Sequence, residues 1–238
     1  MNVKVNYKFV DNDLDKTLVF LHGWGQNIAM MEMLGNAFSN ECNLLYIDLP
    51  GFGASSEPPY VWSVSDYASC INKVIKDLKI DDPIIIGHSF GGKIGLIYAS
   101  LYETNKLICL ASPYCKEMTK LPLKNRLYKH FKKTPGLGWL ANIMKNHVGS
   151  TDYKNASEIM RGILVTSINL EMVDDIKKIK CPTLLIWGTK DTAVPINRAY
   201  ELKDLITDSK LITYNGATHY AYLEKKEEVI KEIRSFIK

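Results

Sequence analysis

Signals of several protein classes are missing from this sequence. Its 238 residues include only five cysteines, an odd number with wide spacing, and no two of them form a Cys-x-x-Cys pair. We therefore expect neither a disulfide framework nor a zinc site, and no bound metal. No apolar run approaches the roughly 18 residues that a membrane-spanning helix needs, so we expect no transmembrane segment.

The sequence also lacks a secretion signal and a strong excess of charge. The first ten residues contain no apolar stretch of the kind that a signal peptide has, and this favours a cytoplasmic protein. Thirty Lys and Arg residues face 26 Asp and Glu residues, which gives a formal net charge of +4. A charge this mild does not indicate nucleic acid as a partner. The length suits one α/β domain with an insertion better than two domains.

Short apolar runs that end in a turn residue recur along the chain. They lie at 16–23, 43–51, 83–89, 106–113, 182–189 and 210–216, and residues 3–10 alternate like an edge strand. Continuous apolar runs are typical of strands that are buried on both faces of a parallel sheet. Helical spacing of apolar residues follows at 65–79, 94–101 and 227–237. Strands that alternate with helices predict an α/β fold with a mostly parallel sheet flanked by helices.

This alternation stops between residues 112 and 180, where helical and loop patterns are punctuated by proline and glycine. We predict a helical lid at 112–180, inserted into a core made of residues 1–111 and 181–238. Ligands of open α/β sheets bind outside the carboxyl ends of the strands. An insertion after the strand at 106–113 is therefore well placed to cover a site.

One serine lies between glycines where an apolar strand runs into a helix. Residues 87–91 read Gly-His-Ser-Phe-Gly, the Gly-x-Ser-x-Gly pattern of a sharp turn that lifts a nucleophilic serine above a sheet. The five-residue pattern alone is weak evidence, but here it follows a strand signal and opens a helix signal. We predict Ser89 as a nucleophile, which requires a base, an acid to orient the base, and donors for an oxyanion.

The base must be one of five histidines. His219 is the only one in a loop that follows a late strand, so we predict it as the base. The others lie in glycine-flanked turns or in the predicted lid: His22, His88, His130 and His147. Asp191, in the loop after the strand at 182–189, is the predicted acid, with a plain turn residue as the alternative. Glu117 is the other carboxylate that could serve.

The oxyanion donors are expected to be backbone N–H groups. The residue after the nucleophile, Phe90, supplies one. The second is expected from the loop after the strand at 16–23, where Trp24 is our choice. No Lys-Ser or Lys-Thr pair follows the glycines at 87–92, so a phosphate-binding loop is not indicated.

Five blocks of this sequence resemble signature blocks of the α/β-hydrolase superfamily: LHGWG, DLPGFGASS, GHSFGG, WGTKDTAVP and GATHYAYLEK. They are similar to those of serine-nucleophile esterases, which include carboxylesterases and the pimeloyl-[acyl-carrier protein] methyl ester esterases. The resemblance covers residues 16–238 except the predicted lid. It implies an α/β-hydrolase fold and a cofactor-free Ser-His-Asp triad in the chain order Ser89, Asp191, His219.

The activity that this implies is hydrolysis of a small carboxylic ester through an acyl-enzyme. A second hypothesis is a C–C bond hydrolase of ring-cleavage products, which resembles the same family. A third, of another class, is a ligand receptor built on a hydrolase fold. The fold alone cannot choose among them, because it hosts many chemistries.

Residues 113–150 carry eight Lys and Arg residues and a single acid, Glu117. A solvated basic face on a lid helix is the simplest interpretation, and an acidic acyl carrier protein or a membrane surface are the alternatives. Substrate-binding residues are not predicted. Five side chains could line an acyl pocket, although such residues are more often core: Trp62, Trp139, Met144, Val194 and Tyr220.

Overall fold

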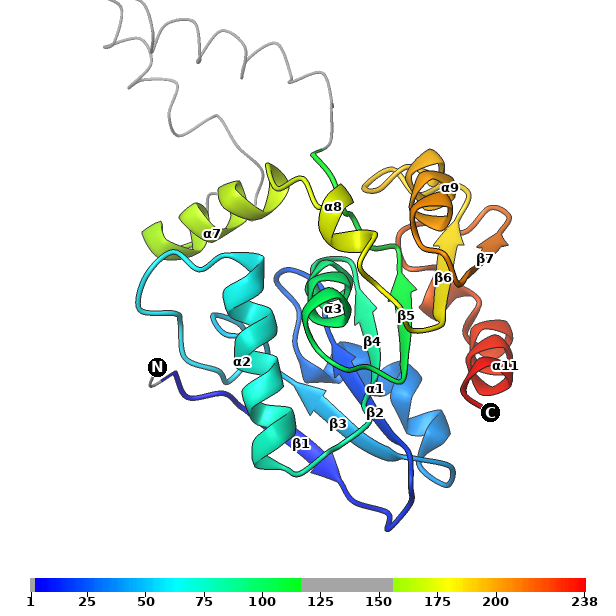
Figure 1. Cartoon of the computed structure of the whole chain (residues 1–238), viewed down its shortest axis with the longest axis horizontal. Coiled ribbons are helices and arrows are strands. Elements are labelled where there is room, and N and C mark those ends of the chain that lie inside the picture. Colours follow the sequence, from blue (N-terminus) through cyan, green and yellow to red (C-terminus); the bar gives the residue numbers. More distant parts are fainter. Residues whose placement is uncertain (1–2, 117–155) are drawn as a thin grey trace, which may run out of the picture.

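A computed structural model describes residues 3–116 and 156–238, and it shows a mostly parallel α/β sheet flanked by helices (Figure 1). The seven strands lie in the order β1-β3-β2-β4-β5-β6-β7, and only β1 is antiparallel to its neighbour. The strands are β1 (Tyr7–Val10), β2 (Thr17–Leu21), β3 (Asn43–Ile47), β4 (Ile84–His88), β5 (Lys106–Leu110), β6 (Thr183–Gly188) and β7 (Ser209–Tyr214). The predicted fold class is confirmed.

The burial of the strands explains their continuous apolar sequences. Strands β2, β3, β4 and β6 are buried along their whole length, whereas β1 and β7 form the two edges and are partly exposed. Alternate residues of one strand face opposite layers. In β2, Val19 and Leu21 belong to one core cluster, and Leu18 and Phe20 belong to the other.

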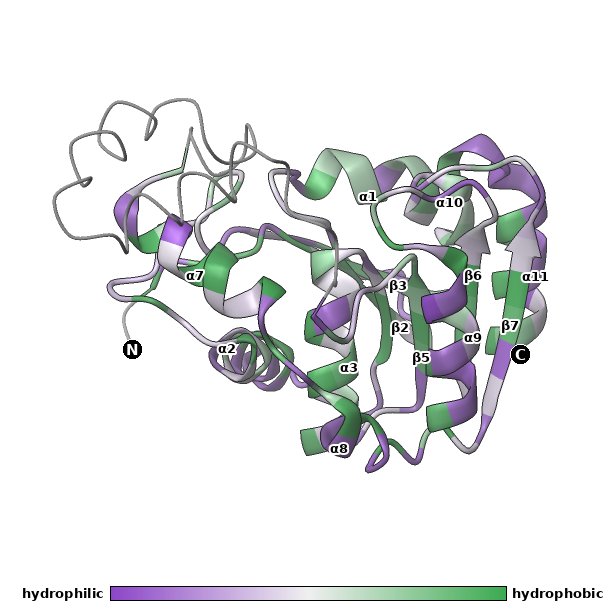
Figure 2. Cartoon of the chain, turned by 90° about the horizontal axis from the view of Figure 1, so that it is seen from above, coloured by the Kyte–Doolittle hydropathy of each residue, from purple (hydrophilic) through white to green (hydrophobic). Residues whose placement is uncertain are grey.

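Helices cover both faces of this sheet. They are α1 (Ile28–Gly35), α2 (Val64–Asp77), α3 (Phe90–Leu101), α7 (Glu158–Ile168), α8 (Val173–Ile176), α9 (Ile196–Leu205), α10 (Ala221–Glu224) and α11 (Lys226–Ile237), with a 3₁₀ turn at Asn36–Phe38. Buried residues of α2, α3, α8 and α9 form one core cluster with the sheet, and those of α1, α10 and α11 form the other. Figure 2 shows α9 with both hydrophobic and hydrophilic bands, as a helix on a sheet face requires.

Helix ends follow the local sequence. Ser63 and Asp66 form the expected cap of α2, because the Ser63 hydroxyl accepts from the Asp66 N–H at 3.2 Å and the Asp66 carboxylate accepts from the Ser63 N–H at 2.8 Å. Helix α3 begins at Phe90, before the predicted start at Ile94. The glycines at positions 91 and 92 lower helix propensity, but here they allow the helix to start against the sheet, where a side chain would collide.

The predicted lid is only partly within the described residues, because 117–155 lie outside them. Its return segment contains α7 and α8. Met160, Ile163, Met172 and Ile176 from this segment are buried in the same core cluster as the sheet. The boundary at Lys180 stays a prediction, and at its C-terminal end the predicted lid packs directly onto the core.

None of the helices in the described ranges combines the length and the apolar character that crossing a bilayer would require.

Candidate active site

The loops after β2, β4, β6 and β7 carry the predicted site residues. Because these strands are parallel to one another, their carboxyl ends meet at one edge of the sheet. The site therefore combines segments that are far apart in the chain.

Ser89 occupies a strained turn between β4 and α3. Its backbone lies at φ +51° and ψ −112°, a conformation that non-glycine residues rarely adopt. The turn is tight enough that a Cβ added to Gly87 would lie 2.5 Å from the Gly91 carbonyl oxygen, and one added to Gly91 would collide with the Leu21 carbonyl. The Ser89 N–H donates to the Leu110 carbonyl at 2.9 Å and so ties the turn to β5. This geometry is the strand–turn–helix context that the sequence pattern requires.

Asp191 and His219 are joined by a hydrogen bond. The Asp191 carboxylate is completely buried, and its Oδ2 lies 2.8 Å from His219 Nδ1. Its Oδ1 accepts from the N–H groups of Ala193 and Val194, each at 2.8 Å. These two donors hold the carboxylate so that His219 Nδ1 donates to it, which leaves the Nε2 lone pair available to accept a proton.

The turn that carries Ser89 contacts His219 through the preceding residue, His88. No hydrogen bond joins the Ser89 hydroxyl to His219 in the described part of the chain, although apo enzymes often show such contacts long or misaligned. The contact between the two loops is made by His88, whose ring centroid lies 4.9 Å from that of His219. The structure thus brings Asp191 and His219 into direct contact, and Ser89 follows the residue whose ring packs against His219.

The loop after β2 is fixed by a buried histidine that the sequence did not assign. His22 Nδ1 lies 2.8 Å from the Gly23 carbonyl, and its Nε2 lies 2.9 Å from the Leu49 N–H. The ring satisfies both partners when it is neutral, with the proton on Nδ1. Burial lowers the pKa of His22 and so favours that neutral form. This side chain determines the path of the backbone that leads to Trp24.

The two residues predicted as oxyanion donors lie side by side. The rings of Trp24 and Phe90 are edge to face with centroids 5.2 Å apart. Phe52 contacts both, at 4.9 Å from Trp24 and 6.4 Å from Phe90. Edge-to-face packing of this kind stabilises the relative position of two loops.

Asp48 is a second residue that the sequence reasoning missed. Its buried carboxylate accepts hydrogen bonds from the Asn6 side chain at 2.8 Å, the Ile28 N–H at 2.8 Å and the Ala54 N–H at 2.9 Å. Gly53, at φ +56°, passes so close that a Cβ there would collide with this carboxylate. Asp48 therefore organises the loop at 48–54, and an acidic residue directly after a buried strand was the available signal.

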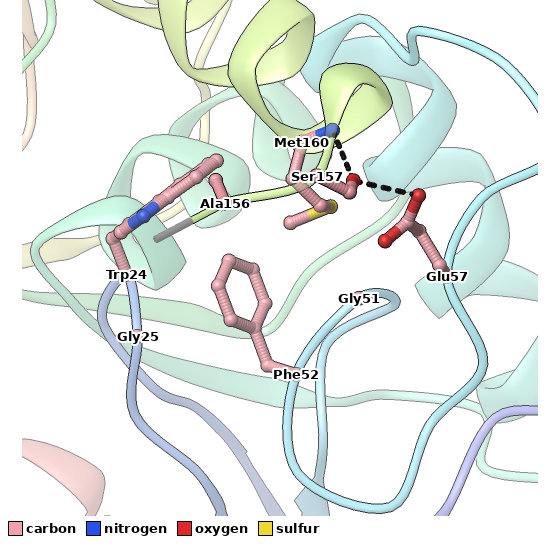
Figure 3. Close-up of a pocket in the computed structure, with 8 residues that line it drawn as sticks. All are labelled: Trp24, Gly25, Gly51, Phe52, Glu57, Ala156, Ser157 and Met160. Carbon is pink, nitrogen blue, oxygen red and sulfur yellow. Dashed lines mark hydrogen bonds between the residues drawn. The ribbon is translucent and has the colours of Figure 1, made fainter. Parts of the chain in front are cut away.

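A pocket of ≈310 Å³ opens beside Trp24 and Phe52 (Figure 3). The described residues that line it are Trp24, Gly25, Gly51, Phe52, Glu57, Ala156, Ser157 and Met160. Figure 3 shows the Met160 side chain between Phe52 and Ser157. The Ser157 hydroxyl donates to Glu57 at 2.8 Å and accepts from the Met160 N–H at 3.1 Å, which closes one side. The lining combines apolar groups, namely two aromatic rings and the Met160 thioether, with the polar groups of Ser157 and Glu57.

Trp62, Val194 and Tyr220, which the sequence offered as candidate lining residues, are not among the described residues that line this pocket. Trp62 and Val194 are buried in the main core cluster, and Tyr220 is 41% exposed with its ring against His88. Trp139, Met144 and the alternative acid Glu117 lie outside the described residues. All five cysteines are free, and no group of three or more His, Cys, Asp or Glu side chains within 3–116 and 156–238 could hold a metal ion.

The chain is similar to known hydrolases in both sequence and structure. A family model described as the alpha/beta hydrolase fold matches residues 16–128 and 114–226. An AB hydrolase superfamily protein of Bacillus subtilis, YisY, is 29% identical over 93% of this chain and 91% of its own length. A pimeloyl-[acyl-carrier protein] methyl ester esterase of Aliivibrio fischeri is 22% identical over 92% of this chain and 93% of its own. An esterase structure from Exiguobacterium antarcticum superimposes with a TM-score of 0.77 at 23% identity, covering 99% of this chain and 96% of that one.

Proposed function

Because the chain belongs to the alpha/beta hydrolase fold family, we propose that this hydrolase cleaves carboxylic esters with Ser89 as nucleophile, His219 as base and Asp191 as acid. The observation that carries the proposal is the 2.8 Å hydrogen bond between Asp191 and His219, and the strained turn at Ser89 supports it. A buried carboxylate that orients a partly exposed imidazole is the arrangement that activates a serine hydroxyl.

The proposed reaction has two halves. His219 Nε2 takes the Ser89 hydroxyl proton as Ser89 Oγ bonds to the ester carbonyl carbon. The tetrahedral intermediate then collapses, the ester C–O bond breaks, and the alcohol leaves with the proton from His219. In the second half, His219 takes a proton from water, the hydroxide oxygen attacks the acyl-enzyme, and the proton returns to Ser89 as the acid departs.

The negative charge on the carbonyl oxygen needs donors that are already in place. The backbone N–H groups of Phe90 and Trp24 are the proposed pair, and the contact between their side chains supports it because it holds the two loops together. Removal of one such donor typically costs roughly 10²–10³ in rate. Asp191 stabilises the imidazolium that forms on His219, and its own charge is satisfied by the N–H groups of Ala193 and Val194.

The pocket beside Trp24 is the proposed acyl site. Its rings and the Met160 thioether favour an apolar group, and its ≈310 Å³ lies at the small end of the range of ligand pockets. Its described lining includes a carboxylate, Glu57, and no Lys or Arg. A substrate with a neutral acyl group therefore fits this lining better than one with a carboxylate, which favours simple esters over acidic ring-cleavage products.

A second candidate is a methyl ester carried on an acyl carrier protein. The eight Lys and Arg residues of segment 113–150 and the similarity to the Aliivibrio fischeri esterase favour it. An acidic carrier would bind this segment through charge, so that binding would weaken with added salt. Most of the segment lies outside the described residues, and the partner stays a proposal.

The chemical test of the proposal is covalent labelling. In the reaction of a fluorophosphonate with an activated serine, the serine oxygen displaces fluoride from phosphorus and forms a stable phosphonate ester. We expect one equivalent on the peptide that contains Ser89, with loss of labelling in both Ser89→Ala and His219→Ala. Labelling that persists in Ser89→Ala at the same stoichiometry would refute the assignment of the nucleophile.

A further inference from the structure

His88 is a buried histidine at the site for which the proposed reaction has no use. It is the last residue of β4, it immediately precedes Ser89, and it is 1% exposed. Its ring lies among three rings of the segment after β7, with centroid distances of 4.9 Å to His219, 5.3 Å to Tyr220 and 4.8 Å to Tyr222. A histidine in this position contacts both the nucleophile turn and the loop that carries the base.

The two ring nitrogens of His88 face two different loops. Nε2 lies 3.2 Å from the backbone carbonyl oxygen of His219. Nδ1 lies 3.3 Å from the side-chain oxygen of Gln26, in the loop after β2. The same Gln26 oxygen accepts from the Gly23 N–H at 2.9 Å, and the Gln26 amide nitrogen donates to the Tyr220 hydroxyl at 3.4 Å. One pair of side chains thus connects the loops after β2, β4 and β7.

Both ring nitrogens of His88 face oxygen atoms, and a neutral ring can donate to only one of them. The short bond from the Gly23 N–H fixes the Gln26 oxygen toward Gly23, so Gln26 cannot offer a proton to His88. Burial lowers the pKa of His88 to about 3, with a smaller contribution from the nearby His219, so the ring is neutral and has one proton. We assign that proton to Nε2, where it donates to the His219 carbonyl, because the Gln26 oxygen already accepts from the Gly23 N–H. The loop that carries the base is then hydrogen-bonded to the residue before the nucleophile.

Gly23 makes room for this arrangement. A Cβ at Gly23 would lie 2.9 Å from His88 Nδ1 and 3.0 Å from the Gln26 oxygen. These distances are shorter than ordinary van der Waals contact, so a larger residue would displace one of the two side chains. The backbone of the loop after β2 is therefore built around the His88–Gln26 pair.

We propose that His88 is a positioning residue: its Nε2–H group holds the His219 backbone, and thereby the imidazole, in the orientation in which it can accept the Ser89 proton. Gln26, in the loop of Trp24, packs against the opposite edge of the His88 ring, and its oxygen is held there by the Gly23 N–H. The proposal rests on the proposed function, since it assigns His88 a part in the same serine chemistry. His88 itself does not touch the reacting atoms.

Three substitutions of His88 distinguish hydrogen bonding to the His219 backbone from a role in packing alone. In His88→Gln the amide nitrogen occupies about the position of Nε2 and can donate to the His219 carbonyl. In His88→Asn the nitrogen occupies about the position of Nδ1 and faces Gln26 instead. His88→Leu keeps the bulk and donates to neither. We expect kcat to fall roughly 10- to 100-fold in His88→Leu and His88→Asn with KM nearly unchanged, and to recover to within a few-fold of wild type in His88→Gln.

A second measurement does not depend on turnover. The proton shared by His219 Nδ1 and Asp191 gives a far-downfield ¹H NMR resonance, which is identified by its loss in Asp191→Asn. We expect that resonance to be retained in wild type and His88→Gln, and to broaden or disappear in His88→Leu and His88→Asn. Thermal unfolding of each variant shows whether it is folded, and activity is expressed per site labelled by fluorophosphonate.

Each outcome either supports the positioning role of His88 or contradicts it. If wild type hydrolyses no ester but the resonance follows the expected pattern, the positioning role stands and the proposed function fails. If His88→Leu is folded and keeps both kcat and the resonance, the positioning role is wrong. It is also wrong if His88→Asn recovers activity and His88→Gln does not, because Gln26 would then be the partner that matters. If His88→Leu does not fold, the Gln and Asn variants decide in the same way.

Discussion

The carboxylate of Asp48 accepts a hydrogen bond from the Ile28 N–H, 20 residues earlier in the chain, at 2.8 Å. Ile28 is the first residue of α1, and Asp48 is the first residue after β3. The bond joins the end of the Trp24 loop to the start of the loop at 48–54, which contains Phe52. Two of the segments that line the pocket therefore depend on one buried side chain.

We predict that Asp48→Asn destabilises the protein by roughly 2–3 kcal/mol, because an amide nitrogen replaces one acceptor and faces an N–H donor. Either Ile28 on one side, or Asn6 and Ala54 on the other, loses its partner. Urea unfolding at pH 7 measures the change. Asp77→Asn is the matched control, since Asp77 is exposed and its pair with Lys73 contributes little. Equal effects of the two substitutions would contradict this account of Asp48.

Asp191→Asn is expected to lower kcat by roughly 10⁴ and to leave the fold intact. The amide that replaces the carboxylate can present its nitrogen to His219 Nδ1, which favours the tautomer that has its proton on Nε2 and cannot accept from Ser89. Asp175→Asn, at an exposed ion pair with Lys178, is the control. Rates near those of wild type would move the acid elsewhere, and Glu117→Gln would be the next variant to measure.

Stability is expected to depend on two buried histidines at mildly acidic pH. Burial lowers the pKa of His22, and lowers that of His88 to about 3. An unfolded chain binds a proton on each histidine below about pH 6.5, whereas folded His88 stays neutral until about pH 3. The unfolded state therefore gains protons first, and the His88 contribution to stability falls as the pH drops from about 6.5 toward about 3, by up to about 1.4 kcal/mol per pH unit.

The measurement is urea unfolding of wild type and His88→Gln at pH 7 and at pH 4.5. We expect wild type to lose more stability between the two pH values than the variant, which cannot titrate at position 88. Identical losses in both proteins would show that His88 is not held neutral by the fold.

The sequence alone was sufficient for the sheet, because each buried strand is an uninterrupted apolar run with a turn residue after it. It was also sufficient for the cap of α2, where Ser63 and Asp66 have the required spacing. Helix α9 was not predicted. Only Ala199 and Leu202 of its ten residues are buried, so its apolar periodicity is too weak to recognise.

At the site, some residues could be predicted from the sequence and others could not, for a related reason. Ser89, Asp191 and His219 could be proposed because each follows a strand in a recognisable block. His22, His88, Gln26 and Asp48 could not be given roles, because their partners are backbone and side-chain groups that only the folded chain brings within hydrogen-bond distance. The sequence therefore indicated the chemical groups, and the structure was needed to find what holds them.

The central claim is that Ser89 is the nucleophile of an esterase. Steady-state hydrolysis of p-nitrophenyl esters with acyl chains of two to twelve carbons tests it most directly, with Ser89→Ala measured in parallel as the blank. We predict turnover that is highest for short chains and is lost in Ser89→Ala while thermal unfolding is unchanged. Activity of Ser89→Ala within tenfold of wild type would contradict the claim.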